Sequence, residues 1–253
     1  MDKKYNFLKP IRNKNLIRLG RKADGGYVVD KEIVHNTNYL ITFGLGPDWS
    51  FELDYIKHNP MIKIFMYDYT VSSFPYLKDI WKYLRRFLTF RAKLKDVLDR
   101  VTYLKNYLNF LKLKEVNFYP EKITFPMKKK IDTDIDKVFS RLPKDAQVVL
   151  KSDIEGSEFE IIDGILKHQS KIKMIIFEFH WMNKNERIFL ESLNKLKDKF
   201  NIIHIHGNNH CEKLPSGLPI ALEMTLLNKD IQKDEGEYVK NFPIQNLDYP
   251  NNP

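Results

Sequence analysis

The sequence predicts an α/β protein with an open sheet whose two faces are covered by helices. Short apolar segments rich in β-branched and aromatic residues alternate with segments whose apolar residues recur at helical spacing. Strands separated by helices form a parallel sheet with two covered faces, so this alternation carries the prediction. Seven strands are expected, at residues 38–43, 62–67, 116–124, 147–150, 172–179, 202–206 and 219–227.

In the first half of the chain, glycines mark the ends of the expected elements. A polar lead-in ends at the turn tripeptide 24–26, and the apolar run 38–43 stops at Gly44. The length of this run, its β-branched content and its glycine stop favour a buried strand over a helix. A helix is expected over 50–58, followed by a second buried strand at 62–67.

In the second half, helices alternate with more strongly apolar strands. Helices are expected at 133–141, 157–167 and 184–199, where apolar residues recur at helical spacing. Residues 172–179 give the strongest strand signal of the chain. The tail after about residue 232 is expected to be extended or loosely attached, because chain ends that nothing ties down are poorly ordered.

Length and composition agree with a single domain spanning 1–253. The chain has 253 residues, of which 43% are hydrophobic and 13% aromatic, enough for a real core. One cysteine, Cys211, excludes an internal disulfide framework and a cysteine-cluster zinc site. No segment reaches the roughly 18 apolar residues of a membrane span, and the first residues lack the apolar stretch of a signal peptide. We therefore expect a soluble, cytoplasmic protein.

An insertion interrupts the alternation and carries the charge imbalance of the chain. Apolar residues at helical spacing over 75–112, with basic residues on the other faces, predict one or two inserted amphipathic helices. The net charge is +9, yet residues 71–130 hold 15 Lys and Arg against 5 Asp and Glu, and the remainder holds 27 against 28. A basic segment on a neutral body predicts an anionic partner.

Four interpretations of this insertion are open. It is an amphipathic hairpin whose apolar stripe packs on the sheet while Lys and Arg stay in solvent, or a lid that holds a phosphorylated or nucleotide-linked sugar. Peripheral contact with an anionic membrane also fits, and the 12 aromatic residues within 71–130 are compatible with RNA. Acceptor affinity that falls steeply with added salt would favour the anionic ligands.

Chemically useful residues follow the expected strands. Ligands of open α/β sheets bind beyond the carboxyl ends of the strands, so residues at these positions are candidates for a site. In chain order they are Gly44 and Gly46, Asp68, Asp153 and Glu155, and Glu178 and His180.

The glycine loop at 43–48 predicts a close approach of backbone and ligand, because glycine has no Cβ. Asp68 follows Gly44 by 24 residues, about the spacing at which an acid binds ribose hydroxyls. Position 49 is Trp49, so the third glycine of a dinucleotide-binding loop is absent. Adenosine without a diphosphate therefore fits better than NAD, and the alternative is an ordinary strand–helix loop.

Two carboxylates, Asp153 and Glu155, flank one residue at the end of a buried strand. They suit a general base, a group that orients a substrate hydroxyl, or an oxygen ligand for Mg²⁺, whereas a helix cap is the structural alternative for Asp153. Glu178 and His180 lie on one side of their strand by its two-residue period.

Three histidines near the end of the chain suggest a metal site less strongly. Strand spacing places His204 and His206 on one face, and His210 lies beyond them. Without cysteine, a zinc site would have to use histidines and carboxylates alone.

These residues resemble the FkbM-type family of S-adenosylmethionine-dependent methyltransferases. The segment 150–160, LKSDIEGSEFE, is similar to the K-x-D-x-E-G-x-E block of that family. The glycine loop, Asp68, the segment 177–180 and the lead-in 24–27 also resemble it, as does the segment 204–209. The likeness spans 24–227, and the long basic insertion departs from the common pattern.

The resemblance implies a Rossmann-like, seven-stranded methyltransferase sheet whose last strand is antiparallel, and S-adenosyl-L-methionine as cofactor. It also implies roles for individual residues. Gly44, Gly46 and Asp48 would line the methionine portion of the cofactor and Asp68 its ribose, whereas Asp153, Glu155 and His180 would face the acceptor.

The implied activity is O-methylation of a sugar hydroxyl, in the biosynthesis of a capsular or surface polysaccharide. His180 or Asp153 would take the hydroxyl proton, or a divalent ion such as Mg²⁺ on Asp153 and Glu178 would acidify it. The expected partner is a sugar, a nucleotide-sugar or another anionic acceptor, and no DNA. The alternatives are methylation of a small phosphorylated or amine-bearing glycan modifier, and a non-catalytic glycan- or RNA-binding protein of this fold.

Overall fold

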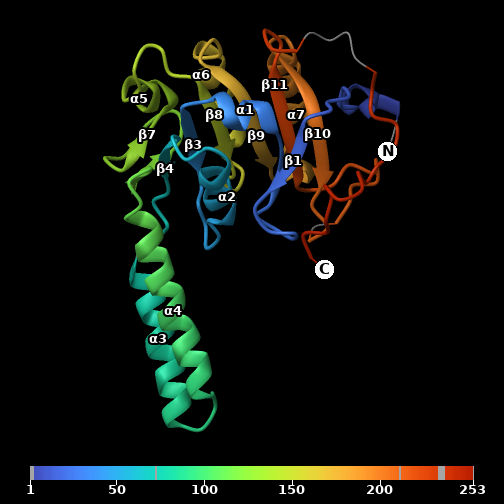
Figure 1. Cartoon of the computed structure of the whole chain (residues 1–253). Helices are drawn as coiled ribbons and strands as arrows, with labels where there is room; N and C mark the ends of the chain where they lie inside the picture. Colours follow the sequence, from blue (N-terminus) through green and yellow to red (C-terminus); the bar gives the residue numbers. More distant parts are fainter. Residues whose placement is uncertain (1–2, 72, 211, 233–236, 253) are drawn as a thin grey trace.

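The computed structural model describes residues 3–252 except 72, 211 and 233–236, and consists of a sheet-centred body with a long helical arm (Figure 1). The body contains a central sheet of seven strands in the order β10-β11-β9-β8-β3-β4-β5. Their bounds are β3 Tyr39–Phe43, β4 Lys63–Tyr67, β5 Val116–Tyr119, β8 Val148–Ser152, β9 Ile172–Phe179, β10 Phe200–Gly207 and β11 Leu222–Asn228.

The strand directions confirm the predicted fold class. β3 pairs in parallel with β4 and β8, β4 with β5, and β8 with β9. The last strand, β11, lies between β9 and β10 and is antiparallel to both. A parallel sheet with one late antiparallel strand inserted near its edge is the Rossmann-like methyltransferase arrangement.

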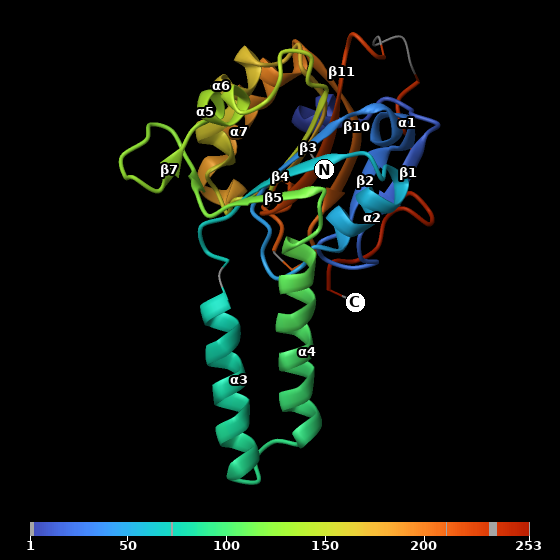
Figure 2. The same ribbon diagram turned by 60° about the vertical axis from the view of Figure 1, so that its left-hand side comes forward.

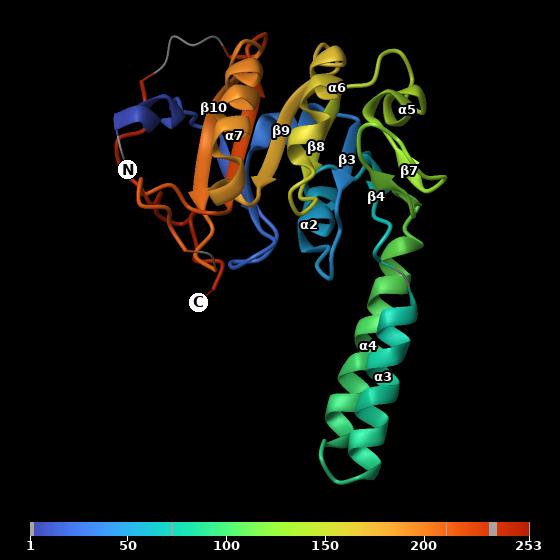
Figure 3. The same cartoon turned by 180° about the vertical axis from the view of Figure 1, so that it is seen from behind.

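Helices cover both faces of the sheet, as expected from the alternation. Helices α1 (Lys31–Asn36) and α2 (Ser50–His58) cover one face (Figure 1), and α5 (Ile135–Ser140), α6 (Ile162–Lys167) and α7 (Met182–Lys197) cover the other (Figure 3). Strand β9 shows why its sequence is apolar throughout. Ile175 and Phe177 pack in the core under α5–α7, whereas Met174 and Ile176 pack in the core under α1 and α2.

Two predicted elements are divided in the structure. The expected strand at 116–124 splits into β5 and β6 (Lys122–Ile123), which pairs with β7 (Asp132–Thr133) in a separate small sheet. The expected helix at 157–167 begins as a 3-10 turn, η2 (Glu158–Ile161), before α6. Pro120 lies at the first division, and proline cannot donate a ladder hydrogen bond.

The N-terminal segment is more ordered than a polar lead-in. It forms η1 (Lys3–Leu8) and an antiparallel pair, β1 (Leu16–Leu19) with β2 (Tyr27–Asp30). β2 is buried along its whole length, so the apolar residues after the 24–26 turn form part of the core.

The prediction of a loosely attached tail is wrong for residues 237–252, and residues 233–236 lie outside the described part of the chain. Tyr238 forms a β-bridge with Ile11, and the Leu247 carbonyl accepts a hydrogen bond from Arg18 at 3.1 Å. Asp248 accepts from His204 Nε2 at 2.8 Å in a buried pair. Each of these contacts joins the tail to a residue far away in the sequence. Local sequence patterns therefore do not predict them.

The insertion forms a hairpin of α3 (Ser73–Leu88) and α4 (Leu94–Leu111), here called the arm, that projects from the body (Figure 2). At its base, the ring of Trp49 lies 5.7 Å from that of Phe110 and 5.2 Å from that of Tyr103. The predicted apolar stripe is buried at Val97, but most of it is exposed to solvent, so the interpretation in which the stripe packs on the sheet is wrong. Among the described residues, no helix combines the length and apolarity that crossing a bilayer requires.

Candidate active site

The predicted site residues meet where the parallel strands end. Strands β3, β4 and β8 are in parallel register, so their carboxyl ends share one edge of the sheet. A cavity of about 320 Å³ at this edge is lined by Gly44, Asp68, Asp153 and Glu155 among others. The structure therefore brings these four residues, which were predicted from their positions after strands, to one cavity.

Gly44 is fixed by the contact between two strands. Its φ is +76°, and a Cβ there would lie 1.7 Å from the backbone carbonyl oxygen of Asp153. Gly46 has a φ of +59°, but a Cβ there would meet nothing within 4 Å. Gly44 is thus a structural requirement for joining β3 to the Asp153 loop, and the predicted cofactor contact of both glycines stays a prediction.

Replacing Gly44 with alanine is expected to lower the free energy of unfolding by about 2–5 kcal/mol, from left-handed strain plus the clash with Asp153. The matched variant Gly46→Ala has the strain without the clash, so we expect about 1 kcal/mol. Urea unfolding of the two variants measures the difference. Equal losses would show that the Gly44–Asp153 approach is not tight.

Asp68 ties the glycine loop to the end of β4. Its Oδ2 accepts from the backbone N–H groups of Leu45 at 2.9 Å and Gly46 at 3.1 Å. Its Oδ1 accepts from the Thr70 backbone N–H at 2.8 Å and from the Thr70 hydroxyl at 2.6 Å, with Val71 N at 3.3 Å. The carboxylate thus fixes the loop around the cavity, and the expected contact with ribose stays a prediction.

Asp48 lies at the start of α2 and is not among the residues that line the cavity. Its Oδ1 accepts from the Ser50 backbone N–H at 3.0 Å and its Oδ2 from the Ser50 hydroxyl at 3.1 Å. These bonds form a turn immediately before the helix, and the expected role of Asp48 near the methionine portion of a cofactor stays a prediction.

A tyrosine joins the carboxylates of two neighbouring strands. The Tyr27 hydroxyl lies 3.1 Å from Asp153 Oδ2 and 3.1 Å from Glu178 Oε2, and it can donate its one proton to either. Asn208 donates to the other oxygen of Glu178 at 2.9 Å. Burial and the charges of both carboxylates hold the pKa of Tyr27 well above its ordinary value, so the phenol is a permanent donor.

His180 lies among carboxylates from three segments. Its Nδ1 lies 3.0 Å from Glu158 Oε1, and its Nε2 lies 3.7 Å from Asp153 Oδ1, 3.8 Å from Glu178 Oε1 and 3.9 Å from Glu155 Oε2. Glu158 is completely buried and also accepts from the Ile154 backbone N–H at 3.0 Å. The structure thus brings Asp153, Glu155 and His180 together, as expected.

The protonation states distinguish Asp153 from His180. Burial and the nearby charge of Glu178 raise the pKa of Asp153 to about 7, although Lys151 and His180 oppose the shift. Burial alone would lower the pKa of His180, but the hydrogen bond with Glu158 and the surrounding carboxylates raise it to about 9. At neutral pH His180 is therefore a cation, whereas Asp153 is poised to accept a proton.

The backbone beside this cluster is strained. Glu155 and Trp181 have φ values of +55° and +57°, a region that residues other than glycine rarely occupy. Gly156 lies against the indole, since a Cβ there would meet Trp181 Cδ1 at 2.7 Å, and Trp181 Nε1 donates to the Glu155 carbonyl at 3.3 Å. Strain of this kind concentrates at functional sites.

The C-terminal tail closes the far side of the carboxylate cluster. Asn251 Nδ2 donates to Glu223 at 2.6 Å and to Asp24 at 3.1 Å, and its Oδ1 accepts from His206 Nε2 at 3.1 Å. Burial and Glu178 raise the pKa of Glu223 to about 8. His204 and His206 contact Asp248, and neither belongs to a group of described side chains close enough to hold a metal ion, so the structure does not support a zinc site at these two histidines.

Sequence reasoning missed three kinds of site residue. The sequence indicates Tyr27 only as part of the lead-in 24–27, and Glu158 only as part of the segment 150–160. Asn251 and Glu223 gave no signal, because their pairing depends on the fold of the tail. On the other side of the cavity, Glu121 and Lys122 follow β5 and line it, as the strand-end rule could have suggested.

A buried ion pair between Lys151 and Glu52 lies next to the site. Lys151, the residue before Ser152 and Asp153 on β8, lies 3.2 Å from Glu52 of α2, with side-chain exposures of 4% and 0%. Thr42 donates to the same Glu52 oxygen at 3.1 Å, and the ammonium lies 5.1 Å from the Tyr27 ring centroid. Although burial lowers the pKa of Lys151, the charges of Glu52 and Asp153 outweigh it and raise that pKa.

Comparison with known proteins gives likenesses of fold. No known family model matches the chain, and no curated protein matches its sequence. Human methyltransferase-like protein 13, solved with S-adenosylhomocysteine, is 11% identical with a TM-score of 0.46, over 83% of this chain and 79% of that one. A Clostridium thermocellum protein described as a putative rRNA methylase is 10% identical with a TM-score of 0.44, over 78% and 90%.

A third structure, a precorrin-6y C5,15-methyltransferase from Geobacter metallireducens, is 11% identical with a TM-score of 0.39, over 78% of this chain and 83% of that one. The strand order with its antiparallel β11 carries the fold assignment for this protein.

Proposed function

We propose that this protein is an S-adenosylmethionine-dependent O-methyltransferase of the FkbM type, which methylates a sugar hydroxyl during the synthesis of a capsular or surface polysaccharide. The observation that supports it best is the position of Asp153. This carboxylate lies on the cavity that Gly44 and Asp68 also line, and its pKa is about 7. A proton acceptor and a nucleoside-sized cavity thus share one wall.

The cavity fits an adenosine-bearing cofactor in size and lining. Its volume of about 320 Å³ lies at the lower end of the range for ligand sites. Tyr69 and Ile123 supply an aromatic and an apolar side chain, and Lys122 and Asp68 supply charged groups. Within this lining the glycine loop offers a close backbone approach, and its sequence has no third glycine for a pyrophosphate.

The reaction needs a base and an aligned acceptor. When bound, the cofactor supplies a methyl group on a sulfonium, which passes to the acceptor oxygen while the sulfur leaves as a thioether. Asp153 would take the hydroxyl proton, and Tyr27 would hold the carboxylate in position through Oδ2. The His180 cation, fixed by Glu158, would bind the acceptor or another anionic group near Asp153.

A divalent ion is the second candidate for activating the acceptor. Asp153, Glu158 and His180 each offer one ligand atom, and these atoms lie within 4.8 Å of one another. A cation there would have to displace the proton that the raised pKa of His180 indicates. We therefore favour proton transfer to Asp153 over metal activation.

Transfer of labelled methyl groups to a panel of sugars, nucleotide-sugars and phosphorylated glycans tests the proposal. We expect turnover with a hydroxyl acceptor that survives a chelator. Turnover that a chelator abolishes and Mg²⁺ restores would establish the metal route instead. Methylation of an amine or of RNA alone would contradict the sugar assignment.

A further inference from the structure

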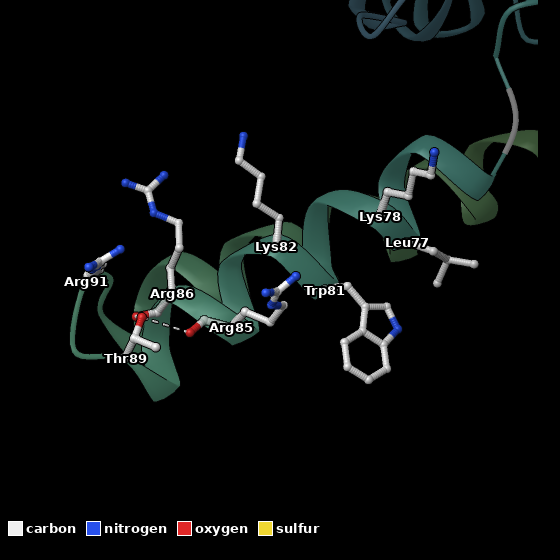
Figure 4. Close-up of a pocket in the computed structure, with 8 residues that line it drawn as sticks. All are labelled: Leu77, Lys78, Trp81, Lys82, Arg85, Arg86, Thr89 and Arg91. Atoms are coloured by element: carbon white, nitrogen blue, oxygen red, sulfur yellow. Dashed lines mark hydrogen bonds between the residues drawn. The ribbon is translucent and has the colours of Figure 1, made fainter.

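The arm exposes apolar side chains that the body leaves uncovered. On α3, Trp81 and Leu88 are 65% and 68% exposed, and Leu77 is also exposed. Trp81 and Leu77 project to one side of the helix, whereas Lys82 and Arg86 project to the other (Figure 4). At the tip, between the two helices, Phe90 is 98% exposed beside Arg91. Such exposure of large apolar residues in one place marks an interaction surface.

The second helix continues the same surface. Its exposed apolar residues are Leu94, Leu98, Val101 and Leu108. At about 100° per residue, they lie about 140–180° around α4 from Tyr103, which contacts the body and Tyr76. Leu77, Trp81 and Leu88 likewise lie about 100–140° around α3 from Tyr76. Both stripes therefore turn out of the contact between the helices, and because α3 and α4 run antiparallel, rotation in the same sense along the chain brings them to one side of the arm, here called the apolar face.

Basic residues surround the apolar face. Residues 73–111 contain nine Lys and Arg and three Asp, with no Glu. Lys78, Lys82 and Arg85 line a surface hollow along α3 together with Leu77 and Trp81. Long basic side chains can lay their aliphatic stems along an apolar surface while their charges reach outward. The pattern is an apolar stripe with a cationic margin.

We propose that the arm binds to the surface of an anionic lipid bilayer through its apolar face. Leucine, tryptophan and phenylalanine side chains would enter the boundary between headgroups and acyl chains, and the flanking Lys and Arg would meet the anionic headgroups. Trp81 and Phe90 have the amphipathic or aromatic character that favours this boundary. Since the arm follows β4 at the edge of the sheet that carries the candidate site, binding keeps that site near the membrane.

Charge and side-chain type favour this partner over two others. A second copy of the arm would bring another excess of basic residues against the first, and like charges oppose that contact. Single-stranded RNA binds by stacking on aromatic rings, yet most of the apolar face is leucine and valine. An anionic bilayer satisfies both the aliphatic face and the cationic margin.

Vesicle flotation with the full chain tests the proposal without reference to enzymatic activity. We expect binding to vesicles of phosphatidylcholine mixed with phosphatidylglycerol, weaker binding in added salt, and little binding to phosphatidylcholine alone. The double variant Trp81→Ser/Phe90→Ser should lose about tenfold or more in partitioning. Arg85→Glu/Arg91→Glu, which reverses charges beside Trp81 and Phe90, should lose a similar factor on anionic vesicles only.

The matched control is Met61→Ser, because Met61 is an exposed apolar residue on the body, away from the arm. It should bind vesicles like the unaltered chain. All substituted positions are exposed, so thermal unfolding should be unchanged and a loss of binding is not a loss of fold. No binding to anionic vesicles, or equal binding by the arm variants, overturns the proposal. A dimer or an RNA complex that forms in place of vesicle binding and is lost in Trp81→Ser/Phe90→Ser also overturns it.

Discussion

Replacing Asp153 with asparagine is expected to reduce kcat about 100- to 10,000-fold, the contribution of a positioned proton acceptor. The amide has the shape of the carboxylate, and its oxygen can still accept the Tyr27 hydrogen bond. It cannot take a proton from an acceptor hydroxyl. In the unaltered protein, kcat/KM should fall as pH decreases below about 7, because Asp153 becomes protonated there.

The matched control for this variant is Asp145→Asn, since Asp145 is exposed in the turn that precedes β8, at the opposite end of that strand from Asp153. We expect this variant to retain most of the activity. Affinity for S-adenosylhomocysteine should change little in either variant, which separates chemistry from cofactor binding. Full activity in Asp153→Asn, or a pH profile that stays flat through pH 7, would remove Asp153 from the role of base.

Replacing Lys151 with methionine is expected to lower the free energy of unfolding by about 3–5 kcal/mol. The substitution keeps an unbranched chain but leaves the Glu52 carboxylate buried without its cation. Glu52 would still accept the hydrogen bond of the Thr42 hydroxyl at 3.1 Å, which does not neutralise its charge. A buried uncompensated charge is among the most destabilising single changes in a protein.

The double variant Lys151→Met/Glu52→Gln identifies the cause. It removes the stranded charge, so we expect it to recover at least half of the stability lost by Lys151→Met alone. Urea unfolding followed by circular dichroism measures all three proteins. A loss below about 1 kcal/mol for Lys151→Met would mean that water or another group compensates Glu52.

The fold was predictable because local patterns and tertiary structure agree in the sheet. Each central strand is apolar on both faces, as in β9, and glycine or a charged residue marks where it ends. The sequence did not predict where the arm and the C-terminal tail lie relative to the sheet. The spacing of apolar residues in α3 predicts a helix with an apolar stripe, but it does not say whether protein or another partner covers that stripe.

The candidate site was predictable where it depends on strand ends. Asp153, Glu155 and His180 follow buried strands, and the parallel register of β8 and β9 brings them together. Tyr27 reaches the same cluster from β2, which belongs to a separate two-stranded sheet, so no strand-end rule includes it. Asp68 was expected to bind ribose, but in the structure its carboxylate accepts hydrogen bonds from the glycine loop. These bonds depend on the fold, so the sequence pattern does not reveal them.

Calorimetric titration with S-adenosylhomocysteine tests the central claim most directly, with NAD as the matched ligand. We predict saturable binding of S-adenosylhomocysteine at one site per chain and no comparable binding of NAD, because the glycine loop has no third glycine to receive a diphosphate. Absence of binding by S-adenosylhomocysteine at millimolar concentration, or tighter binding of NAD, would contradict the account.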